Sequence, residues 1–295
     1  MTAPPQVTAA ADPHPARVGA LCMVAAVFCF TLLDAIGKHL VVSGVNPLQA
    51  VWGRYAFSAA PLLLLPVLAG WRRVATTRPG LQLARGLTLI GATAAMFTAL
   101  RSLQLADAYA LSYVSPLIVA AMSHRVLHER LTRWQWAALL VSFGGALVVI
   151  RPAFAQAGIA IVFPLLMAVS YAAYQVLTRV ARRTDDATVC VFHASLAGAL
   201  LMSLLMPFVW EPLPLVVWGW FAAAGTLGVV GHWLLAVAAN RAPPSLLSPL
   251  IYLQLLYAAL LGFAIFGSIP DGWTIIGSTI ILAGGALLWL VAPRG

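Results

Sequence analysis

Long apolar stretches follow one another along almost the whole chain, and they constrain its fold more than any other feature. They lie at 18–42, 47–69, 80–103, 106–127, 132–150, 157–180, 188–209, 214–240, 244–267 and 272–292. A helix needs about 20 apolar residues to cross the hydrocarbon core of a membrane, which is ~30 Å thick. Transmembrane β-strands are shorter and alternate in polarity, which these stretches do not. The chain is therefore predicted to be an all-α polytopic membrane protein with ten transmembrane helices.

Charged residues are scarce and lie mostly between the stretches. They make up 8% of the 295 residues, against roughly 25% in an average soluble domain. The net charge of +9 comes from arginines in short loops rather than from a basic surface exposed to water. The three cysteines lie inside apolar stretches without metal-ligand or disulfide spacing. We therefore expect the lipid bilayer and a small-molecule substrate as partners, no nucleic acid, no metal and no cofactor.

The loop arginines also predict how the chain is oriented. If the N-terminus is cytoplasmic, eleven loop arginines lie on the cytoplasmic side and Arg151 alone lies outside. Cytoplasmic loops carry an excess of Lys and Arg, so this bias predicts that both termini are cytoplasmic. The eleven are Arg17, Arg72, Arg73, Arg78, Arg125, Arg130, Arg133, Arg182, Arg183, Arg241 and Arg294.

Two short signatures occur once in each half of the chain. Ser-Pro-Leu at 115–117 recurs at 248–250, and Gly-Gly-Ala-Leu at 144–147 recurs at 284–287. Each half has five spans, an odd number, so the second half must enter the membrane from the opposite side. The sequence therefore predicts two inverted five-helix repeats, whose substrate site lies near the midplane where the halves meet.

The alignment of the halves extends beyond these signatures. Residues 106–117 match 239–250 at a constant offset of 133. A weaker match at an offset of 141 pairs Phe30 with Tyr171, Asp34 with Gln175, and Lys38 with Arg179. The predicted organisation is a mobile cytoplasmic N-terminus (1–17), a first repeat (18–150), a linker (151–156) and a second repeat (157–292).

Four motifs in this order resemble the drug/metabolite transporter superfamily, and within it the EamA-type exporters. They are Ala-Leu-x-x-Leu at 99–103, the two Ser-Pro pairs, His-Glu-Arg-Leu-Thr at 128–132 and the two Gly-Gly-Ala-Leu signatures. The resemblance covers 18–292, but the second half has Gly-Ser-Ile-Pro at 267–270 in place of the Glu-containing loop. The abundance of Trp and Tyr is similar to that of the aromatic amino-acid exporters.

The resemblance implies a bacterial inner-membrane carrier, and not an enzyme, that exports small metabolites by alternating access through a central cavity between the repeats. Amino acids, either aromatic or apolar, are the expected cargo. Two alternatives stay open: a proton-coupled multidrug exporter for cationic compounds, with Asp34 as its carboxylate, and an intramembrane lipid-modifying enzyme. Whether the protein is a monomer or a homodimer is also open.

Polar residues inside the spans are costly, so they are candidates for substrate contacts. Asp34 and Lys38, one helical turn apart, could contact a zwitterionic substrate or neutralise each other in a structural ion pair. Arg54 could reach a substrate carboxylate or tie two helices together. An aromatic pocket with few polar groups suits an apolar or aromatic amino acid, with helix packing as the alternative for each residue. The predicted substrate-binding residues are Phe30, Asp34, Lys38, Phe97, Arg101, Tyr113, Tyr171, Gln175, His232 and Tyr252.

The signatures themselves carry conformational predictions. Pro116 and Pro249 each remove a backbone donor and bend their helix, so they are predicted hinges, with a static kink as the alternative. The glycines of the fifth and tenth spans predict close helix packing, within one chain or across a homodimer.

Overall fold

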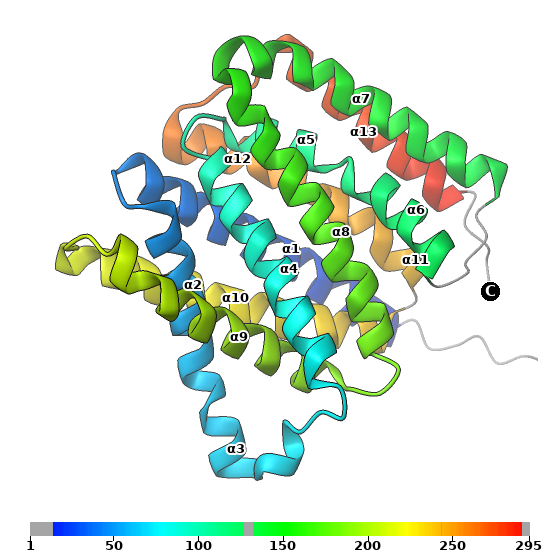
Figure 1. Ribbon diagram of the computed structural model, residues 1–295. Coiled ribbons are helices and arrows are strands. Elements are labelled where there is room, and N and C mark those ends of the chain that lie inside the picture. Colours follow the sequence, from blue (N-terminus) through cyan, green and yellow to red (C-terminus); the bar gives the residue numbers. More distant parts are fainter. Residues whose placement is uncertain (1–13, 127–131, 243, 291–295) are drawn as a thin grey trace, which may run out of the picture.

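The computed structural model describes residues 14–126, 132–242 and 244–290, and all regular structure in these ranges is helical (Figure 1). The helices are α1 (His14–Val42), α2 (Pro47–Leu62), α3 (Leu64–Ala69), η1 (Trp71–Arg73), α4 (Pro79–Ala99), α5 (Leu105–Ser112), α6 (Ser115–Val126), α7 (Arg133–Ala157), η2 (Gly158–Ile161), α8 (Val162–Ala181), α9 (Ala187–Val209), α10 (Leu215–Arg241), α11 (Pro244–Leu247), η3 (Ser248–Tyr252), α12 (Leu253–Phe266) and α13 (Gly272–Leu290). Most of the motif at 128–132, residues 1–13 and Arg294 lie outside the described residues.

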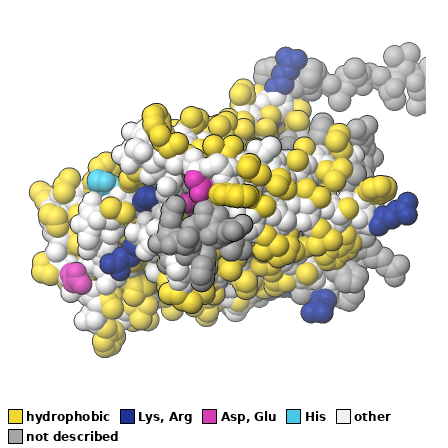
Figure 2. Space-filling model, turned by 90° about the horizontal axis from the view of Figure 1, so that it is seen from above, with side chains coloured by type: hydrophobic (Ala, Val, Ile, Leu, Met, Phe, Trp, Pro, Cys, Tyr) yellow, Lys and Arg dark blue, Asp and Glu magenta, His cyan; other side chains and the backbone are white. Residues whose placement is uncertain are grey.

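Several helical segments are suited to a bilayer by length and composition. Within the described part of the chain, six are long and apolar enough to cross a membrane: Ala16–Val42, Pro47–Ala69, Leu105–Met122, Gly158–Ala181, Ala187–Val209 and Leu215–Arg241. Shorter apolar helices cover Arg133–Val149, Leu250–Phe266 and Gly272–Leu287. Hydrophobic side chains spread over the face shown in Figure 2, where charged side chains are few and separate. The prediction of an all-α membrane protein is confirmed.

Among the described residues, four of the predicted spans are interrupted, and one is the sixth, which contains the end of α7, the 3-10 helix η2 and α8. The second divides into α2 and α3 at Leu63, and the fourth divides into α5 and α6 at Tyr113 and Val114. The ninth consists of α11, the 3-10 helix η3 and α12. Pro116 lies in the first turn of α6, where a missing backbone donor costs little. The predicted linker at 151–156 is helical and continues α7.

The helices pack in pairs that join the two halves of the chain. The most extensive contacts are those of α1 with α10, α4 with α8, α2 with α9, and α7 with α13. Further contacts join α1 to α12, α6 to α8, α2 to α10 and α4 to α9. Figure 1 shows α7 and α13 side by side along one edge, while α3 projects from the opposite edge. The main core includes Leu33, Phe97 and Phe221.

Glycines bring α7 and α13 into close contact. A Cβ atom added at Gly145 would lie 2.6 Å from the carbonyl oxygen of Gly277. A Cβ atom added at Gly277 would lie 2.5 Å from Cγ2 of Val149. By contrast, a Cβ atom at Gly144 would meet no atom within 4 Å. The predicted close packing of the fifth and tenth spans therefore occurs within one chain.

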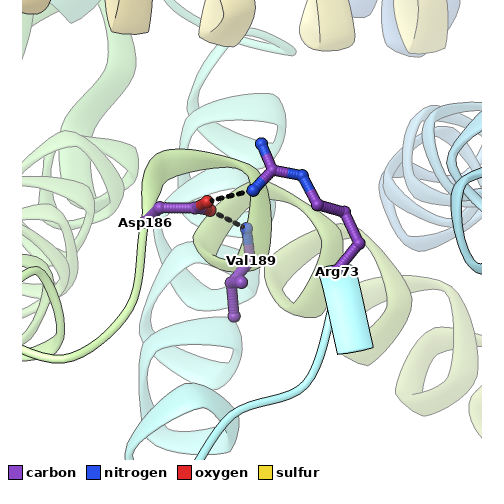
Figure 3. A network of polar contacts seen from close by, with 3 residues as sticks. All are labelled: Arg73, Asp186 and Val189. Carbon is purple, nitrogen blue, oxygen red and sulfur yellow. Dashed lines mark hydrogen bonds and ion pairs between the residues drawn. The ribbon is translucent and has the colours of Figure 1, made fainter. Parts of the chain in front are cut away.

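Polar contacts between loops identify one end of the helix bundle. Asp186 caps α9 by accepting a hydrogen bond from the backbone N–H of Val189, and the same carboxylate forms an ion pair with Arg73, at 3.0 Å (Figure 3). The neighbouring Asp185 is buried and accepts hydrogen bonds from Thr76 and Gln82. Burial alone would raise the pKa of the Asp185 carboxyl, but these hydrogen bonds outweigh it and hold the pKa below its usual value. The loop before α4 therefore adjoins the loop before α9.

Other loops meet at a second location. The side-chain amide of Gln49, near the start of α2, donates to the carbonyl oxygen of Glu211, between α9 and α10, at 2.8 Å. The ammonium of Lys38, near the end of α1, donates to the carbonyl oxygen of Leu103 at 2.8 Å. The two ends of the bundle are called below the Asp186 end and the Lys38 end.

Candidate functional site

A cavity of about 450 Å³ lies between helices of both halves. Pockets for small molecules have volumes of about 300–1,000 Å³, so this one suits a small metabolite. Its polar and aromatic lining consists of Phe30, Asp34, Arg54, Thr93, Tyr109, Ser112, Tyr113, Ser115, Gln135, Tyr171, Tyr174, Gln175, Arg179, His232, Tyr252 and Gln254. The remaining lining is apolar and includes Leu33, Leu89, Met96 and Met167.

The acidic group of the cavity is Asp34, on α1. Its Oδ2 accepts a hydrogen bond of 2.6 Å from the hydroxyl of Tyr109, on α5. Tyr109 is 4% exposed, whereas Asp34 is partly exposed to the cavity. Because the hydroxyl is neutral, it orients the carboxylate without cancelling its charge. Asp34 is the one acidic side chain among the described residues that line the cavity.

A basic group, Arg54 on α2, lines the same cavity. Its Nη1 donates to the hydroxyl oxygen of Thr93, on α4, at 2.6 Å, and the Tyr55 hydroxyl lies 3.0 Å from the same oxygen. Arg54 is only 8% exposed. A guanidinium has five N–H donors in a planar fork, which suits it to bind a carboxylate. The hydrogen-bond partner of Arg54 is therefore a neutral hydroxyl, as is that of Asp34, so neither partner cancels the charge it binds.

Aromatic rings form much of the remaining wall. Tyr113 and Tyr252 stack with ring centroids 5.1 Å apart and an interplanar angle of 15°. Gly285 makes room for this pair, because a Cβ atom there would lie 2.3 Å from the Tyr252 ring. Tyr171 and Tyr174, on α8, lie 6.0 Å apart at an angle of 25°. These flat apolar faces suit an aromatic or apolar part of a ligand.

The predicted site residues divide into two groups. Those on the cavity are Phe30, Asp34, Tyr113, Pro116, Tyr171, Gln175, His232 and Tyr252. Among them, the rings of Phe30 and His232 meet edge to face at 4.8 Å. The Nδ1 atom of His232 is bound to the carbonyl oxygen of Gly228, at 2.7 Å. Pro249 lies in η3, and its side chain is outside the described residues.

Lys38, Phe97 and Arg101 are not in the cavity lining. Lys38 lies beyond it on α1, with its ammonium 5.1 Å from the centre of the Phe266 ring. Phe97 is fully buried and packs against Gly37. Arg101 is exposed in the turn after α4. Asp34 and Lys38, which could have neutralised each other, have Tyr109 and Leu103 as their separate partners.

Two tyrosines of the cavity were absent from the predicted site. Tyr109 lies one helical turn before Tyr113, and Tyr174 lies three residues after Tyr171. Such spacings place side chains on the same face of a helix, so both could have been found from their predicted neighbours. Among the described residues, no group of three or more His, Cys, Asp or Glu side chains could hold a metal ion.

Several known proteins that are similar to this chain are described as transporters. The pseudopaline exporter CntI of Pseudomonas aeruginosa is 28% identical over 90% of this chain and 94% of its own length. The riboflavin transporter of Rhizobium johnstonii is 27% identical, over 94% and 93% respectively. The S-adenosylmethionine uptake transporter of Rickettsia bellii is 22% identical, over 84% and 85%.

One solved crystal structure supports the fold. It superimposes with a TM-score of 0.63 at 20% identity, over 92% of this chain and 98% of that one. The EamA-like transporter family matches the sequence twice, at 17–151 and at 158–290. The helices of this chain are suited to a bilayer, and the relatives named above are transporters of small molecules rather than enzymes. This chain is a membrane transporter and belongs to the EamA-like transporter family.

Proposed function

We propose that this transporter exports an aromatic or apolar amino acid, or a closely related zwitterionic metabolite, by alternating access through the central cavity. The observation that carries the proposal is that one cavity contains a carboxylate, a guanidinium and two pairs of tyrosines. Asp34 would bind the substrate ammonium, Arg54 would bind its carboxylate, and the tyrosines would contact its side chain. The relatives carry different cargoes, so the lining of this cavity is the better guide to the substrate.

We also propose ten transmembrane helices arranged as two inverted repeats, 18–150 and 157–292. The two family matches support this division. So does the helix packing: exchanging α1 with α8, α2 with α9, α4 with α10, α6 with α12 and α7 with α13 leaves the pairs α2–α9 and α7–α13 unchanged. The same exchange converts the contacts α1–α10, α1–α12 and α2–α10 into the observed contacts α4–α8, α6–α8 and α4–α9. In such transporters, one repeat rocks against the other around a site at their interface. The interruptions near Pro116 and Pro249 are the proposed hinges.

The loop arginines support a location in the inner membrane of a bacterium with both termini in the cytoplasm. Arg73, Arg182 and Arg183, at the Asp186 end, belong to the predicted cytoplasmic group. That end would therefore face the cytoplasm, and the Lys38 end would face outward.

Transport assays with purified protein in liposomes test the substrate directly. We expect labelled tryptophan and phenylalanine to enter faster than into empty liposomes. Tryptamine lacks the carboxylate, and indole-3-propionate lacks the ammonium, so each should compete less well than tryptophan. A panel of other amino acids, riboflavin and S-adenosylmethionine measures the breadth of specificity. Failure of every amino acid to exceed the empty-liposome rate would refute the proposal.

Two substitutions test the assigned charges. Asp34→Asn should weaken tryptophan binding about 10- to 100-fold, which corresponds to a charged hydrogen bond of about 1.5–3 kcal/mol. It should leave indole-3-propionate binding unchanged. Arg54→Gln should weaken tryptophan binding to a similar extent while leaving tryptamine binding unchanged. Equal losses for all three ligands in either variant would mean that the side chain has a structural role instead.

Export of cationic drugs is the second candidate, because Asp34 supplies a carboxylate inside the cavity. Arg54 and Arg179 line the same cavity and oppose the binding of a simple cation. Uptake of the tetraphenylphosphonium cation by the same liposomes, without amino-acid uptake, would favour this candidate over the first.

A further inference from the structure

The cavity reaches the two ends of the bundle unequally. It is lined by Arg179, near the end of α8, and this residue is exposed. Toward the Lys38 end the cavity stops at Asp34 and Tyr109, and the polar groups beyond them are buried. Lys38 is 7% exposed and Asp107 is 5% exposed. The structure is therefore open toward Arg179 and closed at the Lys38 end.

Of the contacts that hold the Lys38 end closed, the hydrogen bond from Lys38 to Leu103 lies within the first half, and the other two join the halves. The ammonium of Lys38 donates to the carbonyl oxygen of Leu103 and lies over the ring of Phe266, at the end of α12. Beside it, the hydroxyl of Thr274, on α13, donates to Asp107, on α5, at 2.7 Å. A path from the cavity to this end would require these contacts to separate.

Lys38 and Arg179 occupy equivalent positions in the repeated halves. The offset of 141 that pairs Phe30 with Tyr171 also pairs these two cations. Their helices also have equivalent neighbours, because α1 packs on α10 and α12 while α8 packs on α4 and α6. One member of the pair is buried in a closed end, and the other lies exposed at an open end.

We propose that Lys38 and Arg179 are reciprocal gate residues, each closing its own end of the transport path in one of the two states. This inference rests on the proposed inverted repeats and alternating access. When the protein opens at the Lys38 end, Arg179 becomes buried at its own end, in an arrangement equivalent to that of Lys38 in the present structure. Lys38 binds the carbonyl oxygen of Leu103, just after α4, and lies over the ring of Phe266, at the end of α12. The repeat exchanges α4 with α10 and α12 with α6, so Arg179 binds a carbonyl oxygen at the C-terminal end of α10 and contacts the end of α6. Carbonyl groups at helix C-termini favour cations, which gives the closed end a specific partner.

Labelling of a cysteine in the cavity tests the proposal without any substrate. Ser112 lines the cavity, so Ser112→Cys is the reporter, in a background whose three native cysteines are replaced by alanine. A membrane-impermeant maleimide is applied to right-side-out and inside-out vesicles, and the labelling rate from the Lys38 side is compared between variants. Because the assay needs no transport, a failure here is distinct from a failure of the proposed cargo.

The two gate variants should change this rate in opposite directions. Lys38→Met removes a contact of the present state and should raise labelling from the Lys38 side by about tenfold, as expected for one charged hydrogen bond. Arg179→Met should lower the same rate, and the double variant should return toward the parent. Thr274→Val removes the hydrogen bond to Asp107 and should also raise labelling from the Lys38 side. It is a second variant that weakens the closed Lys38 end. Shifts of both gate variants in the same direction, or unchanged rates in protein that remains monodisperse, would overturn the proposal.

Discussion

The charged residues of the cavity show what helical spacing can and cannot predict. The spacing of Asp34 and Lys38 allowed a mutual ion pair, but Asp34 binds Tyr109 and Lys38 binds the Leu103 carbonyl. Both partners lie far away in the sequence, so they depend on how α1 meets α4 and α5. Asp34 was a predicted site residue because a charge within a span is costly. That argument could not predict that Tyr109 is the partner of Asp34.

The stacked tyrosines should determine the preference for aromatic substrates. Tyr252→Leu removes one ring of the Tyr113 pair and should raise the KM for tryptophan about two- to tenfold, the range of a lost aromatic contact. Tyr252→Phe keeps the ring and should retain most of the affinity. Uptake kinetics of tryptophan and leucine in liposomes measure this difference. A rise in KM that is equal for leucine would argue against a contact with the aromatic side chain.

The buried carboxyl of Asp185 should make stability depend on pH. Asp185→Asn should lower the free energy of unfolding by about 1–2 kcal/mol at neutral pH, because the hydrogen bonds from Thr76 and Gln82 favour the carboxylate. The pKa of Asp185 is lowered in the folded protein, so its contribution is complete above the unfolded value, about 3.9, and is lost as the pH falls through the folded value. Thermal unfolding in detergent should thus show the two proteins converging in acid. A constant difference down to about pH 3 would contradict this account.

At the scale of single elements, the sequence predicted the apolar spans better than their interruptions. The Ser-Pro signatures indicated distortion near Pro116 and Pro249, and the fourth and ninth predicted spans are indeed divided there. No comparable signal showed that α7 would continue through 151–156. The length of an apolar stretch indicates whether it can cross a membrane. The positions at which a helix begins and ends depend instead on local caps and on packing.

The glycines of the α7–α13 contact should differ sharply in their tolerance to substitution. Gly277→Leu places a side chain against Val149 and the Gly145 carbonyl, so the two helices must separate. We expect a lower yield of monodisperse protein and an apparent Tm reduced by several degrees. Gly144→Ala is the matched control, because its Cβ atom meets nothing and alanine favours a helix by about 1 kcal/mol over glycine. Size-exclusion profiles and melting curves compare them, and equal losses in both variants would contradict the packing argument.

At the scale of the whole molecule, the predicted repeat identified the helices that surround the cavity. It was a poorer guide to the side chains that line the cavity. Phe30 with Tyr171, and Asp34 with Gln175, are pairs in the predicted alignment of the halves, and all four residues line the cavity. Their side chains differ, however, and Arg54, which binds Thr93, gives the cavity a positive group. In the proposed function, specificity depends on side chains that differ between the halves, so similarity between the halves cannot predict it.

The proposed inverted repeat makes a final prediction about two loop positions that it treats as equivalent. Ser43 and Thr184 are separated by the offset of 141, and both are exposed just after equivalent helices, α1 and α8. Inversion places equivalent positions on opposite sides of the membrane, whereas a parallel repeat places them on the same side. In the background without native cysteines, an impermeant maleimide applied to right-side-out vesicles should label Ser43→Cys and leave Thr184→Cys unlabelled. Inside-out vesicles should give the reverse pattern, and the background protein shows any labelling that does not depend on the new cysteine. Labelling of both variants from the same side would refute the inverted arrangement, and with it the equivalence of the two proposed gates.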